Sequence, residues 1–295
     1  MDASDIYLKT ATGKLYGTRL DPGGGPAPLA LVIADAGPTD RDGNNPLSGR
    51  SDCLRLVAEN LAAFGIASVR YDKRGVAASA DAAPREEDLR FDVYVEDIRR
   101  WCDYLTRDAA VSRIVLIGHG EGGLAAILAA ARTEVGGLVT LAASGSPADR
   151  MLRRQLAAAG LPDELRTHAN GIIDSLAAGQ PVGYVDPRLS ALFRPSAQPY
   201  LISQFRHDPL ASLRAVRCPV LVVQGTHDNQ IMLADAEALV AARPGTALAT
   251  FAGMNHVLKE TPADLGSNIA AYNDPTLPLA AGLVACIAEF IEVRH

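Results

Sequence analysis

The sequence has few aromatic residues, few cysteines and almost no lysine. Aromatic residues make up 5% of its 295 residues, and 24 of its 28 basic residues are arginines that lie scattered without a basic run. With a formal net charge of −6 as well, we expect no nucleic-acid partner. No segment reaches the roughly 18 unbroken apolar residues of a membrane span, so we expect no membrane partner either.

The cysteines lie far apart and form no CxxC pair. Each lies in an apolar or amphipathic stretch, so we expect reduced core thiols. The N-terminal segment, MDASDIYLKT, has neither the basic start nor the continuous apolar run of a signal peptide. Together these features predict a cytoplasmic protein. The cysteines are Cys53, Cys102, Cys218 and Cys286.

Apolar sequence is abundant enough for one large core. The chain is 48% hydrophobic and 21% charged, as is typical of globular proteins. Two short β-rich runs, 6–10 and 15–20, predict an antiparallel hairpin. After them, continuous apolar runs alternate with amphipathic segments, the last at 277–292. This alternation predicts an α/β protein whose mostly parallel sheet is covered by helices on both faces.

The alternation stops between residues 144 and 212. This interval is helix-prone, then rich in proline, and contains no convincing strand. We predict a helical cap over residues 144–212 and a core formed by 1–143 and 213–295. Surface padding without a function is the alternative.

The stretch from Ile114 to Leu124 carries the most chemical information. Its apolar strand pattern stops in Gly-His-Gly-Glu-Gly-Gly and restarts as a helix. In the GxSxG nucleophile elbow, such a sharp turn raises the central residue above the sheet. Gly118 and Gly122 match the flanking glycines, but the central residue is Gly120. The nucleophilic hydroxyl of the pattern is therefore missing.

Two further residues follow in the chain order that the elbow motif requires. Asp228 comes after the apolar run LVVQGTH, and His256 lies in GMNHVLK after the last expected strand. Both belong on loops at the carboxyl edge of the sheet, where such folds build their sites. An oxyanion hole is expected from the backbone N–H groups of Gly37 or Ala36 and of Glu121.

These motifs resemble those of bacterial α/β-hydrolases of the serine-esterase and serine-aminopeptidase-like group over nearly the whole chain. The resemblance implies an eight-stranded sheet with a hairpin first, a cap after the sixth strand, and hydrolysis of esters or related acyl bonds. It makes Asp228 the triad acid and His256 the base, with Gly120 in the nucleophile position. The matching stretches are AGPTDRDGN at 36–44, YDKRGV at 71–76, GHGEGG at 118–123 (GHSEGG in the family), QGTHD at 224–228 and MNHVLK at 254–259.

The chain departs from the family pattern at Gly120 and at three other positions. Asp35, Ala36 and Ala77 stand where the pattern has Gly, Ser and Gly. The loss of the serine removes the acyl-enzyme step. A substitution made to trap a substrate and a natural change to a protein without a covalent intermediate both fit the sequence.

Three functions remain open. A hydrolase without a nucleophile would use His256 to activate a water. A non-catalytic homologue would bind a small acyl ligand, and a lyase, cyclase or isomerase would use His256 for proton transfer. No histidine pair has a metal-ligand spacing, so we expect neither metal nor cofactor. The oligomeric state is unspecified.

Contacts to the small-molecule acyl substrate or ligand are expected from the elbow and the cap. Arginines in the cap either attract a carboxylate or form a solvated face; they are Arg150, Arg153 and Arg154. The expected substrate contacts are His119, Tyr184, Tyr200 and Phe205.

Overall fold

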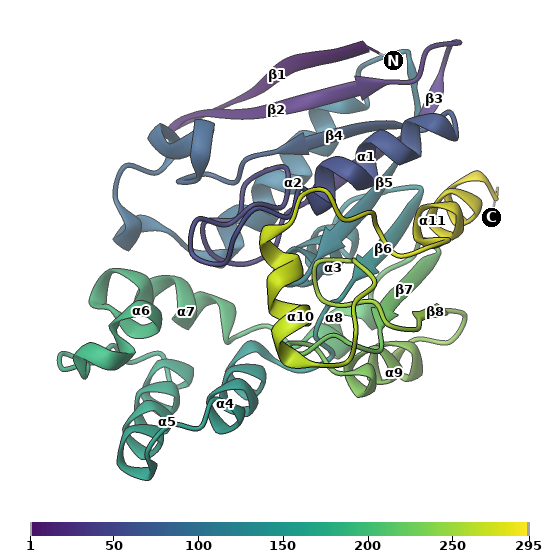
Figure 1. Ribbon diagram of the computed structural model, residues 1–295. Helices are drawn as coiled ribbons and strands as arrows, with labels where there is room; N and C mark the ends of the chain where they lie inside the picture. The colour runs from purple at the N-terminus through teal and green to yellow at the C-terminus, as the bar shows by residue number, and fades with distance from the viewer. Residues whose placement is uncertain (1, 294–295) are drawn as a thin grey trace.

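A computed structural model, in which residues 2–293 are described, contains one eight-stranded sheet (Figure 1). In chain order the strands are β1 (Asp2–Thr10), β2 (Gly13–Asp21), β3 (Ala27–Ile33), β4 (Ala67–Tyr71), β5 (Val111–His119), β6 (Gly137–Leu141), β7 (Val220–Gly225) and β8 (Ala247–Phe251). Their spatial order is β1-β2-β4-β3-β5-β6-β7-β8. The β1–β2 hairpin joins β4 antiparallel, and every later pair is parallel. This confirms the predicted α/β-hydrolase fold.

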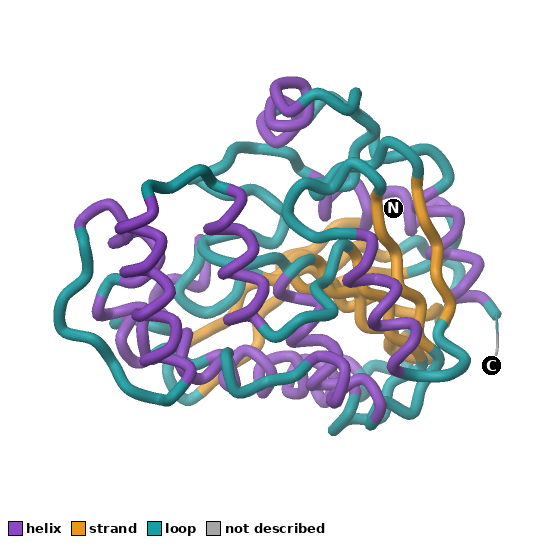
Figure 2. Tube along the Cα trace, turned by 90° about the horizontal axis from the view of Figure 1, so that it is seen from below, coloured by secondary structure: helices purple, strands orange, loops and turns teal. Residues whose placement is uncertain are grey.

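Helices cover both faces of the sheet because its central strands are apolar on both faces. Along β3, Leu29 and Leu31 belong to one buried cluster, whereas Ala30 and Val32 belong to the other. Figure 2 shows helices on either side of the strands. The first cluster includes α2 (Phe91–Leu105), α3 (Glu121–Ala130), α8 (Pro209–Arg214) and α9 (Leu233–Ala242). The second includes α1 (Cys53–Ala63) and α11 (Leu283–Glu292).

The segment between β6 and β7 forms a helical unit that extends away from the sheet (Figure 1). It has its own apolar cluster, in which Ile172, Ile173 and Phe193 are buried. It lies in the interval predicted for the cap. The helix α8 begins in the same interval but packs against α3 and α9 of the core. The helices of the cap are α4 (Ala148–Ala158), α5 (Asp163–Ala177), η3 (Pro187–Leu189), α6 (Ser190–Phe193), η4 (Pro195–Ala197) and α7 (Gln198–Gln204).

The prediction of a final helix over 277–292 is wrong at its start. The helix begins only at Leu283, after Gly282 with a φ of 78°. Before it, Ala280 donates its N–H to Leu258 O, and the segment from 277 to 282 is not helical. The remaining helical segments are η1 (Ala77–Ala82), η2 (Glu86–Asp88), α10 (Leu265–Ala270) and η5 (Ala271–Asn273).

The cysteines are all free thiols. Cys53 and Cys102 are buried as expected, but Cys218 and Cys286 are only half-buried. Between residues 2 and 293, no helix is long and apolar enough to cross a membrane.

Candidate active site

The turn between β5 and α3 has the geometry of an elbow. Gly120 has a φ of 53° and a ψ of −119°, a conformation that glycine adopts without a steric penalty. The neighbouring glycines allow close approach of the backbone: a Cβ on Gly122 would lie 2.5 Å from Ile33 O. Strand, turn and helix therefore meet as the motif predicts.

The side chain of Asp35 fills the space that a side chain at position 120 would need. A Cβ built on Gly120 would lie less than 3.0 Å from Cγ and both oxygens of Asp35, which follows β3. Asp35 Oδ1 accepts the Glu121 backbone N–H at 2.7 Å, and Oδ2 lies 3.1 Å from His256 Nε2. A carboxylate thus occupies the place between elbow amide and imidazole where a nucleophilic hydroxyl is expected.

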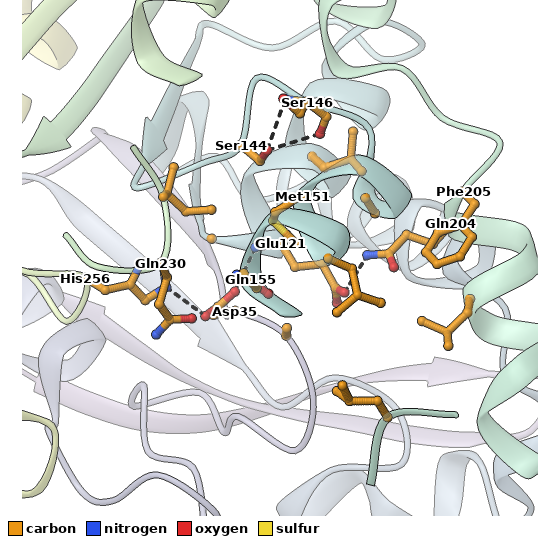
Figure 3. Close-up of a pocket in the computed structure, with 18 residues that line it drawn as sticks. Asp35, Glu121, Ser144, Ser146, Met151, Gln155, Gln204, Phe205, Gln230 and His256 are labelled. Atoms are coloured by element: carbon orange, nitrogen blue, oxygen red, sulfur yellow. Dashed lines mark hydrogen bonds and ion pairs between the residues drawn. The ribbon is translucent and has the colours of Figure 1, made fainter. Parts of the chain in front are cut away.

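His256 lies between two carboxylates (Figure 3 shows the Asp35 side). Its Nδ1 is 2.9 Å from Asp228 Oδ2, and the other oxygen of Asp228 accepts the backbone N–H groups of Gln230 and Ile231. The side chains of His256 and Asp228 are 4% and 0% exposed, whereas that of Asp35 is 20% exposed. Asp35 is therefore the most accessible member of this triad.

The two carboxylates keep His256 protonated at neutral pH. Burial alone would lower its pKa, but the charges and hydrogen bonds of Asp228 and Asp35 raise it from 6.5 to about 10. Burial alone would raise the pKa values of Asp35 and Asp228, but His256 holds both below their usual range. The ion pairs are therefore complete in the neutral range. Their stabilisation is lost as pH rises through about 10 or falls through the lowered carboxylate pKa values.

Two buried side chains with nitrogen donors, His119 and Lys73, support the backbone around the triad. His119 Nε2 donates to His256 O at 2.8 Å, and Lys73 Nζ donates to the backbone oxygen of Asp35. Burial, with the neighbouring charge of His256, lowers the pKa of His119, so this imidazole is neutral. His119 thus supports His256 and does not line the pocket that Asp35 opens into.

That pocket has a volume of about 210 Å³ and lies between the sheet edge and the cap. Much of its wall is apolar, and Asp35 and His256 lie on one side of it (Figure 3). The lining residues are Asp35, Ala36, Gly120, Glu121, Leu124, Ser144, Ser146, Ala148, Met151, Leu152, Gln155, Leu192, Leu201, Gln204, Phe205, Gln230, Ile231 and His256.

Two of the three residues expected to form an oxyanion hole line the pocket. The N–H of Glu121 is already bonded to Asp35, and Ala36 lines the pocket. Gly37 does not line it and is exposed. A substrate oxyanion therefore meets no vacant Glu121 amide in this arrangement.

Among the expected substrate contacts, only Phe205 lines the pocket. Tyr200 lies behind its wall, where its hydroxyl donates to Glu121 Oε1 at 2.6 Å. Tyr184 is 70% exposed and packs near the ring of His168, 5.6 Å away, outside the pocket.

Two of the three cap arginines named from the sequence pair with protein carboxylates. Arg153 contacts Asp174 at 2.6 Å, and Arg154 contacts Asp235 at 2.8 Å. Neither lines the pocket, so they are not placed to attract a substrate carboxylate there.

Sequence reasoning did not identify Asp35 as a residue of the site. It was visible as a departure from the family pattern, but its relation to Gly120 depends on a contact between two loops. Two pocket serines were also missed. Ser144 Oγ donates to Asp235, and Ser146 Oγ accepts from Arg154, so neither hydroxyl is bonded to His256.

The comparisons with known proteins agree with the fold. The family model described as serine aminopeptidase, S33, matches residues 47–261, more than half of the chain. The chain belongs to this serine aminopeptidase S33 family. It is also similar to esterase EstD of Thermotoga maritima, with 24% identity over 274 residues. That match covers 89% of this chain and 63% of EstD, so the chain spans less than two thirds of the esterase.

Solved structures show the same fold at low identity. Est1E from Butyrivibrio proteoclasticus, solved with ferulic acid bound, has a TM-score of 0.62 and 19% identity, covering 97% of this chain and 96% of its own. DcsB, solved in complex with its substrate analogue, has a TM-score of 0.66 and 18% identity, covering 100% of both chains. Both support the α/β-hydrolase fold of this S33-family member.

The close approach of Gly120 and Asp35 predicts that substitutions there are coupled. We expect Gly120→Ala to lower the free energy of unfolding by about 3–5 kcal/mol, because its Cβ displaces two charge-assisted hydrogen bonds of Asp35. In the Asp35→Gly background the same change leaves only backbone strain, about 1–2 kcal/mol. Urea unfolding of the four proteins measures this coupling.

Gly171→Ala is the matched control, since nothing lies within 4 Å of a Cβ there, in the interior of α5. It should be neutral or stabilise the protein by up to about 1 kcal/mol. Equal costs for Gly120→Ala in both backgrounds would show that Asp35 does not fill the nucleophile position.

Proposed function

We propose that this family member is a proton-transfer enzyme, of isomerase, lyase or cyclase type, that forms no covalent intermediate at position 120. The carboxylate of Asp35 is its base, and the imidazolium of His256 is its acid. The observation that carries this proposal is the position of Asp35, which fills the nucleophile position, is bonded to His256 and opens into the pocket.

The surroundings of Asp35 argue against acyl transfer through a tetrahedral intermediate. The elbow amide that would stabilise an oxyanion donates instead to Asp35 Oδ1. Protonated His256 has no free lone pair with which to activate water or a hydroxyl. A carboxylate beside an imidazolium is instead a ready pair for moving one proton on and another off a substrate.

The reaction step balances with these two residues alone. A lone pair of Asp35 takes a proton from a carbon next to a substrate carbonyl, and the C–H electron pair moves into the enolate. His256 Nε2–H donates to the enolate oxygen as negative charge develops there. Return of a proton to a different atom gives an isomer, and loss of a leaving group or ring closure gives a lyase or cyclase product.

The site also defines which substrate group it binds. Asp35, accessible to the pocket, is an acceptor of hydrogen bonds, whereas a serine with an oxyanion hole presents donors to a carbonyl. The reacting head should therefore carry a weakly acidic C–H or O–H group. The apolar wall favours an uncharged head of aryl or alkyl character.

Hydrogen–deuterium exchange tests the proposed reaction. In D₂O we expect the protein to accelerate exchange at the benzylic carbon of 1-phenylpropan-2-one, or of another small ketone in an aryl-ketone panel, as followed by proton NMR. Asp35→Asn should lower this rate by about 10²–10⁴-fold, the usual contribution of a general base. The rate should stay level through the neutral range and change near pH 10, where His256 loses its proton.

Tyr184→Phe is the control, since Tyr184 lies outside the pocket and should not affect exchange. Saturable binding with exchange at the background rate would favour a non-catalytic binder. Ester hydrolysis that needs His256 but survives Asp35→Asn would favour a water-activating hydrolase. Either result contradicts proton transfer by Asp35.

Ester hydrolysis is the second candidate because the similar protein EstD is an esterase. We expect Gly120→Ser alone to remain inactive on p-nitrophenyl acetate, since the serine and Asp35 compete for one space. Asp35→Gly together with Gly120→Ser should produce a burst of p-nitrophenol. Its turnover should be at least about 100-fold faster than that of Gly120→Ser alone, because a nucleophile and a neutral His256 are restored.

Two controls accompany this experiment. Asp35→Gly alone should give no burst, since it has no nucleophile, and adding His256→Ala to the double variant should abolish turnover. An active Gly120→Ser single variant would mean that Asp35 leaves the nucleophile position free.

A further inference from the structure

An outer groove adjoins the candidate active site. Its volume is about 580 Å³, and it lies between the 45–49 turn, the cap helix α4 and the segment formed by α10 and η5. Gln155 and Gln230 line both this groove and the pocket that contains Asp35. Figure 3 shows both glutamines beside Asp35 and His256. The two cavities are therefore adjacent, with the glutamine side chains at their boundary.

The groove presents an exposed leucine on a well-held turn. Leu47 is 84% exposed, yet its turn is closed by the reciprocal backbone bonds between Asn45 and Gly49. The Leu47 N–H donates to Asn45 Oδ1, and the Arg50 N–H donates to Asn273 Oδ1 at the end of η5. These bonds hold an apolar side chain in water, which costs free energy unless a ligand covers it.

The groove is suited to an uncharged ligand. Ala158 at the end of α4, Ala159 directly after it, and Ile269 of α10, which is 55% exposed, add apolar surface to that of Leu47. Its polar groups are amides and hydroxyls, and none of its lining residues in the described chain is charged. At the boundary, Gln230 Nε2 donates to the hydroxyl of Tyr272 at 3.0 Å, which holds the Gln230 side chain in place.

We infer that this groove binds the distal part of an elongated substrate, an uncharged alkyl or aryl tail, while the reacting head lies at Asp35. The inference rests on the proposed function, because it takes the head to be the proton-donating group described above. The two cavities adjoin at Gln155 and Gln230, so one molecule is taken as the occupant of both. The substrate class is therefore an amphiphile with a small acidic head and an apolar tail.

A series of 4-alkylphenols tests this substrate class, with binding measured by isothermal titration calorimetry. The phenol donates to Asp35, and the alkyl chain is lengthened from methyl through propyl and butyl to hexyl. Affinity should rise about two- to fourfold for each methylene that leaves water. In the Leu47→Ser, Ile269→Ser double variant the rise should flatten, while the affinity for 4-methylphenol stays within twofold of the unmodified protein.

Leu265→Ser is the matched control, because Leu265 is also on α10 and 62% exposed but does not line the groove. It should keep the full dependence on chain length. The groove proposal is overturned if affinity depends on chain length equally in the double variant and in the unmodified protein. It is also overturned if affinity does not depend on chain length in the unmodified protein.

Asp35→Asn separates this proposal from the proposed function. It should weaken every phenol, including 4-methylphenol, by at least about tenfold, as expected for loss of a charged acceptor. If the chain-length effect depends on Leu47 and Ile269 but Asp35→Asn has no effect, only the recognition of the head by Asp35 is overturned, and the groove proposal stands. A flat series that still needs Asp35 would overturn the groove alone, and no binding of any member would overturn both.

Discussion

The hydrogen bonds of one carboxylate organise this site. Asp35 bridges the elbow amide of Glu121 and the imidazole of His256, and Lys73 holds its backbone. Because the bridge ends on His256, it adds a second negative partner to the one supplied by Asp228. The protonation of the histidine, the occupation of the elbow amide and the acceptor character of the pocket all follow from this arrangement.

The bridge also explains why Gly120 suits this chain. A side chain at position 120 and the carboxylate of Asp35 cannot occupy the same space, and only glycine leaves that space open. The two departures from the family pattern therefore belong together. A lone replacement of serine by glycine accounts for position 120 but not for Asp35. Together, Gly120 and Asp35 place a carboxylate that pairs with His256 at the elbow.

Much of the fold could be predicted from the sequence because its signals are local or periodic. The largely apolar runs of β3 to β7 and the glycines around position 120 specify strands and an elbow without any long-range information. The start of α11 could not be read in this way, since the apolar residues before it resemble a helix in sequence but form irregular chain and a turn. The same limit applied to Cys218 and Cys286, whose apolar surroundings in sequence lie near the surface in space.

The site was predictable only in part for a related reason. The order of Gly120, Asp228 and His256 places them on neighbouring loops, and the structure brings Asp228 and His256 into contact. Tyr184 and Phe205 look alike as cap aromatics, but only the second faces the pocket. Asp35 follows β3 and Gly120 follows β5, 85 residues apart along the chain. Their close approach can therefore be seen only in the folded structure.

The charge state of His256 tests the central claim most directly. It can be measured by nitrogen-15 NMR of histidine-labelled protein over a pH titration, with the His256 signals assigned by a His256→Gln variant. We expect both imidazole nitrogens to carry a proton at neutral pH, with deprotonation near pH 10. A neutral imidazole at pH 8, with a midpoint near 6.5, would contradict a histidine held between Asp35 and Asp228.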